Sequence, residues 1–174
     1  MAEGRCAVQQ VLEDLQNFAT EKLCARCLPC LLATQNARAL LERLRDGKAI
    51  GGEVHLLREI CRRVLQTARC KYGRGIFDTL ISLLEKRERD FLAHEQARCP
   101  AGACVALLQY HIRPDKCTLC DRCRQVCPAG AVKGEPVAPY RAACRPYEIV
   151  SVKCNRCGLC VAACEEKAII AASA

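Results

Sequence analysis

The sequence contains no tryptophan and few other aromatic residues, with four Tyr and three Phe among 174 residues. A hydrophobic core must therefore be built mainly from Leu, Val, Ile and Ala. No apolar run reaches the 18 residues or so that a membrane-spanning helix needs. The first residues, MAEGRCAVQQVLEDL, lack the apolar segment of a signal peptide. We also find no P-loop, dinucleotide-binding fingerprint, nucleophile elbow or Ser-His-Asp set, so we expect no substrate chemistry from this chain alone.

Cysteine, by contrast, is abundant, with 17 residues. In a small secreted protein this density would indicate a disulfide scaffold. The count is odd, however, and the cysteines fall in tight C-x-x-C runs without a signal peptide before them. We therefore expect a reducing, cytoplasmic compartment in which the thiolates are committed to metal.

The formal net charge of +8 raises the question of nucleic-acid binding. That charge counts the cysteines as neutral, whereas four thiolates around an oxidised four-iron core leave about two negative charges per site. Lys and Arg are also interleaved with acidic residues in RLRDGK and EKRERD. This pattern is typical of solvated helix surfaces, and we expect neither a nucleic-acid partner nor direct membrane insertion.

Residues 1–93 have the periodicity of helices. Apolar residues recur at helical spacing in four segments, and RDGKAIGGE and KYGRG are expected to break the chain between them. These segments predict an antiparallel four-helix bundle. The residues expected to face its core are Val8, Val11, Leu12, Leu15, Phe18, Leu40, Leu41, Leu44, Val54, Leu57, Cys61, Val64, Ala68, Ile76, Phe77, Leu80, Ile81 and Leu84.

Residues 112–174 differ in composition, since prolines appear and cysteines dominate. The stretch DKCTLCDRCRQVCPAGAV aligns with VKCNRCGLCVAACEEKAI, so the chain repeats itself from Cys117 to Cys154, a period of 37 residues. Residues 94–111 would form a linker with two further cysteines. The overall expectation is an α+β protein, with a helical cluster-binding domain followed by a small two-cluster domain.

Each repeat carries the motif C-x2-C-x2-C-x3-C. In this motif the fourth cysteine ligates the cluster of the other repeat. Structural zinc usually takes two C-x2-C pairs with a longer gap and has no use for crossed sets of four. We predict that cluster one is held by Cys117, Cys120, Cys123 and Cys164, and cluster two by Cys154, Cys157, Cys160 and Cys127. Residues 112–171 resemble bacterial two-cluster ferredoxins.

A further three cysteines, Cys24, Cys27 and Cys30, have no fourth partner nearby in the sequence. If residues 31–46 and 53–69 are helices of about 24–26 Å joined by a short turn, the second helix ends beside the start of the first. Cys70 lies at that end and can complete the set. Cys61 falls within the apolar face, where a buried core thiol is expected.

The spacing C-x2-C-x2-C-x39-C, with Pro29 before the third cysteine, resembles the C-terminal helical domain of the flavin-carrying, NADH-oxidising subunit of respiratory complex I and of NAD-linked iron–iron hydrogenases. There the four cysteines hold one four-iron cluster that takes electrons from FMN. Hydrogenase relatives continue through an Arg-Cys-Pro-Ala-Gly-x-Cys linker, present here as residues 98–104, into a two-cluster ferredoxin. The resemblance covers nearly the whole chain, without the FMN- and NAD-binding domain.

The resemblance also implies a zinc ion near the linker, because some hydrogenase relatives hold zinc there with three cysteines and one histidine. His94, Cys99, Cys104 and Cys144 could supply this set, with His111 as the alternative histidine. A pair of thiols in a turn without metal remains the other interpretation. His55 is expected to be a surface residue, and no role is assigned to Cys6.

From these motifs we expect an electron-transfer subunit with three [4Fe–4S] clusters and one candidate zinc ion. Its partners would be other subunits of a redox complex, in particular a flavoprotein with an FMN- and NAD(P)-binding domain. Ferredoxin, a hydrogenase or a molybdenum or tungsten enzyme could lie on the other side of the relay. The alternative is an iron–sulfur sensor that binds a partner without relaying electrons.

Overall fold

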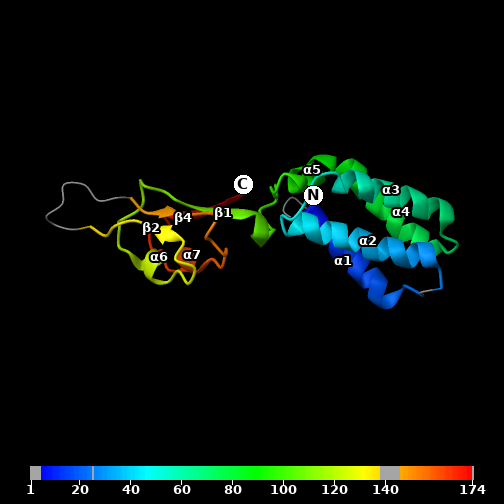
Figure 1. The fold of residues 1–174 in the computed structure, drawn as a ribbon, viewed down its shortest axis with the longest axis horizontal. Coiled ribbons are helices and arrows are strands. Elements are labelled where there is room, and N and C mark those ends of the chain that lie inside the picture. Colours follow the sequence, from blue (N-terminus) through cyan, green and yellow to red (C-terminus); the bar gives the residue numbers. More distant parts are fainter. Residues whose placement is uncertain (1–4, 25, 138–145, 174) are drawn as a thin grey trace. The chain divides into compact units, whose positions relative to one another are not determined.

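The computed structural model describes residues 5–24, 26–137 and 146–173 (Figure 1). The described chain divides into two compact units, one ending at Leu107 and the other covering Leu108–Ser173. The first unit consists of helices, and the second combines short helices with two small antiparallel sheets. The expected mixture of helices and strands is therefore confirmed, and the strands pair antiparallel. No described helix combines the length and the hydropathy that crossing a membrane requires.

The helical unit is built from α1 (Ala7–Glu21), α2 (Leu28–Arg45), α3 (Glu53–Thr67), α4 (Lys71–Lys86) and α5 (Glu88–Glu95). Each of the four longer helices buries the apolar face predicted from its periodicity. Consecutive helices contact each other from α1 to α4, and α5 contacts all four. One core joins them, with Leu41, Leu57 and Phe77 fully buried at its centre.

The turn between α2 and α3 is fixed by a buried carboxylate. Glu53, with a side chain only 2% exposed, begins α3. Its two oxygens accept the backbone N–H groups of Ile50 and Gly51, each at 2.9 Å, and it pairs with Arg43 of α2 at 2.8 Å. Burial opposes ionisation, but these hydrogen bonds and Arg43 together lower the pKa of Glu53. The side chain thus ties the start of α3 to the end of α2.

Two expectations for the helical unit are wrong. The glycines of KYGRG do not interrupt the helix, because α4 begins at Lys71 and includes both. The break lies just before, at residues 68–70, where α3 has ended and Cys70 caps α4. A fifth helix, α5, also follows α4 after a turn at Arg87, and it buries Phe91 and His94. Gly73 lies so close to the sulfur of Cys30 that a side chain at this position would collide with it.

The second unit repeats one strand–helix–strand arrangement. Its first copy has β1 (Leu108–Ile112), α6 (Arg122–Gln125) and β2 (Val132–Lys133). Its second copy has β3 (Glu148–Ile149), α7 (Leu159–Ala162) and β4 (Ile169–Ser173). The helices are displaced by the same 37 residues as the cysteine motifs. Each sheet pairs one strand from each copy, β1 with β4 and β2 with β3. The predicted repeat is therefore also a structural repeat, and the two copies exchange strands.

Candidate iron–sulfur and zinc sites

The helical site comprises Cys24, Cys27, Cys30 and Cys70. Cys30 lies in the first turn of α2, and Cys70 is the N-terminal cap of α4, where its thiol accepts the N–H of Gly73 at 3.3 Å. A Cβ atom on Gly73 would lie 2.9 Å from the Cys30 Sγ and 3.5 Å from the Cys70 Sγ. Both sulfurs therefore face the same glycine, and the return of the chain through the α2–α3 hairpin brings Cys70 to the trio.

The pKa of Cys30 reflects the number of sulfur atoms close to it in this site. Burial, followed by the thiolates of Cys70, Cys27 and Cys24, raises the pKa of Cys30. Four thiolates that repel one another are the donor set that a positively charged iron–sulfur core would neutralise. Cys61 is not part of the set, because it is fully buried in the helical core, where burial raises its pKa to about 12.

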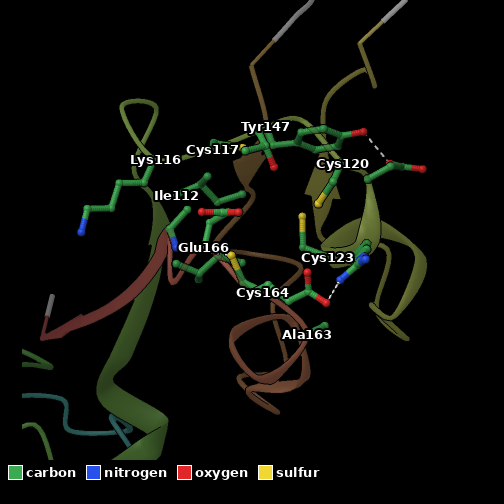
Figure 2. Close-up of a pocket in the computed structure, with 15 residues that line it drawn as sticks. Ile112, Lys116, Cys117, Cys120, Cys123, Tyr147, Ala163, Cys164 and Glu166 are labelled. Atoms are coloured by element: carbon green, nitrogen blue, oxygen red, sulfur yellow. Dashed lines mark hydrogen bonds and ion pairs between the residues drawn. The ribbon is translucent and has the colours of Figure 1, made fainter.

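The cluster-one site is a cavity of about 90 Å³ in the second unit (Figure 2). Cys117, Cys120 and Cys123 line it from the first repeat, and Cys164 lines it from the second; Cys127 does not. The backbone N–H of Ala168 donates to the Cys164 Sγ at 3.3 Å, a contact that orients the sulfur. The structure thus gathers at one cavity the crossed set that the sequence predicts for cluster one.

Three residues of the other crossed set, Cys127, Cys154 and Cys160, lie near one another. The N–H of Ala131 donates to the Cys127 Sγ at 3.3 Å, which is the same contact one repeat earlier. The N–H of Arg156 donates to the Cys154 Sγ at 3.4 Å. Burial, then Cys154 and, more weakly, Cys127 raise the pKa of Cys160, so these sulfurs lie near one another. Cys157 is exposed. Hydrogen bonds from N–H groups to sulfur stabilise the negative charge of thiolate ligands.

A buried carboxylate lines the cavity predicted to hold cluster one. Asp121, 7% exposed, lies between Cys120 and Cys123 and is among the residues lining the cavity. It accepts hydrogen bonds from Arg124 at 2.5 and 2.6 Å and from the hydroxyl of Tyr147 at 2.5 Å. The bonds from Arg124 and then from Tyr147 lower the pKa of Asp121, so the carboxyl is charged at neutral pH. Sequence analysis assigned it no role.

A fourth group of ligands lies in the helical unit. The donor atoms of Cys6, His94, Cys99 and Cys104 all lie within 4.8 Å of one another, and all four residues are buried. The Cys6 Sγ is 3.3 Å from the His94 Nε2 and 3.6 Å from the Cys104 Sγ, and the Cys104 Sγ is 3.5 Å from the His94 Nε2. In tetrahedral zinc coordination, ligand atoms lie about 3.5–3.8 Å apart. Two of these three separations fall in that range, and the third, between Cys6 and His94, is shorter by about 0.2 Å.

The orientation of His94 suits a metal ligand. Its Nδ1 donates to the carbonyl of Asp90 at 2.6 Å, which leaves the Nε2 lone pair facing the sulfurs. Metal-bound histidines usually have such a partner on the other nitrogen. The thiol of Cys6 also has a lowered pKa because of its hydrogen bonds with Cys104 and His94. The hydrogen bond between Cys6 and Cys104 also raises the pKa of Cys104, so without an ion the pair favours one thiolate, that of Cys6.

Three of the four residues predicted for zinc come together here, and the fourth position is occupied by a residue that sequence analysis missed. Cys144 lies outside the described residues, and His111 lies on β1 in the other unit. Cys6 caps the N-terminus of α1 and meets His94 across 88 residues. The sequence offers one hint of a separate role for Cys6, which is that it belongs to no C-x-x-C motif.

Two family matches agree with this geometry. Residues 10–94 match the NADH-ubiquinone oxidoreductase-F iron-sulfur binding region, and residues 116–169 match the 4Fe-4S dicluster domain. The two regions of the chain thus each match an iron–sulfur family, and the resemblance predicted from the sequence is confirmed.

One relative can be named. The NADP-reducing hydrogenase subunit HndC of Solidesulfovibrio fructosivorans is 30% identical over 141 residues, which are 80% of this chain and 29% of the relative. The chain thus spans less than a third of that protein.

Proposed function

We propose that this chain is an electron-transfer subunit with three [4Fe–4S] clusters in a multisubunit oxidoreductase. It would relay single electrons between an NAD(P)H-linked flavoprotein, or another redox subunit, and ferredoxin, a hydrogenase or a molybdenum or tungsten enzyme. The observation that supports this proposal most directly is the cavity lined by Cys117, Cys120, Cys123 and Cys164, together with the approach of Cys30 and Cys70 to Gly73. HndC is by its name a subunit of an NADP-reducing hydrogenase, which supports a complex of this kind.

A bound [4Fe–4S] cluster takes up or releases one electron at a potential that its surroundings set. The chain's contribution is to fix the sulfurs and to shape those surroundings. Backbone N–H groups donate to Cys70, Cys127, Cys154 and Cys164 and offset the negative charge of the thiolates. Partial burial of the ligands limits the rearrangement of water when an electron arrives.

The architecture that we infer follows the same division. We assign α1–α4 to an antiparallel four-helix bundle, supported by the contacts between consecutive helices and between α1 and α4. We assign residues 108–173 to a ferredoxin-like fold, supported by the duplicated strand–helix–strand copies that exchange strands. Residues 138–145, which include Cys144, play no part in this assignment.

Iron content tests the cluster assignment. Anaerobically purified wild-type protein should contain about twelve iron atoms per chain. Cys70→Ala and Cys164→Ala should each remove the EPR signal of one reduced cluster and lower the iron content by about four atoms per chain. Cys61→Ala is the matched control and should keep full iron content. A wild-type value far below about twelve atoms, or full iron in Cys70→Ala, would contradict the assignment.

The relay is tested separately from the clusters. Chemically reduced protein should be reoxidised within the turnover time of its complex by an acceptor subunit, and it should be reduced by the flavoprotein with NAD(P)H. Loss of clusters on oxidation, accompanied by altered partner binding but no electron transfer, would favour the sensor alternative instead.

We also propose that Cys6, His94, Cys99 and Cys104 bind a structural zinc ion. All four protein ligands are present, so the coordination sphere is closed, as in structural rather than catalytic zinc sites. Elemental analysis of the wild type should give about one zinc per chain. Cys6→Ala should lose that zinc while keeping its iron, and Cys61→Ala should keep both. Zinc retained in full by Cys6→Ala would contradict the role of Cys6.

A further inference from the structure

The two repeats of the second unit have matching backbones but different charges at their cluster sites. Asp121 corresponds to Gly158 in the next repeat, and both have left-handed backbone angles, with φ of 69° and 75°. Leu119 corresponds to Arg156 in the same way, with φ of 57° and 60°. At these two aligned positions the first repeat carries a carboxylate and no guanidinium, and the second carries a guanidinium and no carboxylate, so the difference lies in the side chains.

At cluster one, the nearest buried charge is negative. Asp121 lines the cavity, whereas its partner Arg124 does not, and the side chains are 10% and 49% exposed, respectively. Water therefore screens the guanidinium more than the carboxylate. Figure 2 shows the hydroxyl of Tyr147 directed to this carboxylate beside Cys120. The other charged residues that line the cavity are exposed, and they are Lys116, Arg122, Glu165 and Glu166.

At the cluster-two site, the distinguishing charge is positive and belongs to Arg156, whose counterpart in the first repeat is the uncharged Leu119. The side chain of Arg156 is fixed by a hydrogen bond from its Nε to the carbonyl of Leu108 at 2.9 Å. Its own N–H donates to the Cys154 Sγ. The residue that corresponds to Asp121 in the second repeat is Gly158. The hydroxyl of Tyr110 lies 3.5 Å from the position that a Cβ atom would occupy on Gly158. Tyr110 is the counterpart of Tyr147, 37 residues earlier, but it faces a glycine instead of a carboxylate.

We infer that Asp121 and Arg156 order the two reduction potentials, so that cluster one is the lower-potential member of the pair and cluster two the higher. Reduction adds one negative charge, which a buried carboxylate disfavours and a nearby guanidinium favours. An electron that enters at cluster one would then leave it oxidised and reduce cluster two. The inference rests on the proposed clusters and adds the direction of the internal transfer.

The test is an EPR-monitored redox titration of the full chain. Asp121→Asn keeps the shape of the side chain and removes its charge. It should raise the lower midpoint of the pair, changing the equilibrium distribution of the electron between the clusters by about tenfold, or about 59 mV for one electron. Asp115→Asn is the control, because it removes a carboxylate from the exposed pair with Arg113, and it should move neither midpoint by a comparable amount.

The reciprocal variant, Gly158→Asp, adds the carboxylate to the second repeat. Asp121 shows that aspartate adopts this backbone conformation, and the contact with the Tyr110 hydroxyl is an ordinary one. The variant should lower the upper midpoint by a similar amount, so both substitutions bring the two midpoints together. The helical site should be unaffected, and its midpoint serves as an internal reference.

Two results would overturn the inference while leaving the proposed function intact. One is a wider separation of the midpoints in Asp121→Asn, which would mean that cluster one is the higher-potential member. The other is full iron content in both variants with midpoints that match those of Asp115→Asn. Failure of the proposed function is distinct, because it would appear as iron missing from the wild type.

Discussion

Gly73 allows a sharp test of the helical site, because two effects of adding a methyl group there oppose each other. Replacing glycine by alanine at a helical position stabilises a protein by about 0.5–1 kcal/mol. The same Cβ would lie 2.9 Å from the Cys30 Sγ. Ordinary contact starts near 3.4 Å, so the sulfur would have to move by about 0.5 Å, more than the tolerance of about 0.2 Å for metal–ligand distances.

We therefore expect Gly73→Ala to fold but to lose the helical-site cluster. Its iron content should fall by about four atoms per chain, with loss of one reduced-cluster EPR signal. Gly75→Ala is the matched control, because it lies on the same helix and a Cβ there meets nothing within 4 Å. That variant should keep its iron and gain about 0.5–1 kcal/mol in the free energy of unfolding. Gly73→Ala with full iron and an unchanged spectrum would refute the close approach of Cys30.

Three further predictions concern the helical unit. Cys61→Ala should lower the free energy of unfolding by about 1–2 kcal/mol through the lost burial of its sulfur, and in the native wild type Cys61 should resist alkylation that labels exposed cysteines. Glu53→Ala should lower the free energy of unfolding, measured in urea, by about 1–3 kcal/mol because two backbone N–H groups lose their acceptor. Glu59→Ala, which removes a carboxylate from an exposed pair, should change that free energy by less than about 0.5 kcal/mol. Equal effects of the two substitutions would contradict the role given to burial. Removing zinc with a chelator should lower the Tm by more than about 5 °C, and Cys6→Ala should show the lowered Tm without chelator; an unchanged Tm after verified zinc loss would argue against a structural ion.

Much of the fold could be predicted because its signals are local. Helical periodicity identified the apolar faces of α1–α4, and the repeat at Cys117 and Cys154 anticipated the duplicated unit. The error at KYGRG has a physical cause. Glycine there was taken as a helix breaker, but Gly73 lies inside α4, where a side chain would collide with Cys30. A contact between distant segments decided the residue, and no sequence window contains both.

The candidate site residues also fall into those that local spacing predicts and those that depend on contacts between distant segments. Spacing predicted the set of four cysteines that lines the cavity of the second unit, and the α2–α3 hairpin placed Cys70 near Cys30, because both depend on short motifs or a short connection. The role of Cys6 could not be found, since its proximity to His94 depends on how α1 packs against α5. Asp121 was missed because its function depends on burial and on Tyr147, and a sequence does not show that a carboxylate between two cysteines is shielded from water.

The exchange of strands and sulfurs between the two repeats has a consequence for assembly. Each proposed cluster would link the first copy to the second, since Cys164 would ligate cluster one and Cys127 would ligate cluster two. Neither copy could mature as an independent module, and insertion of the first inorganic core would preorganise the pocket for the next. Oxidative loss of one cluster would likewise free a ligand-bearing segment of the other cluster's site. We therefore expect the second unit to gain or lose its two clusters cooperatively.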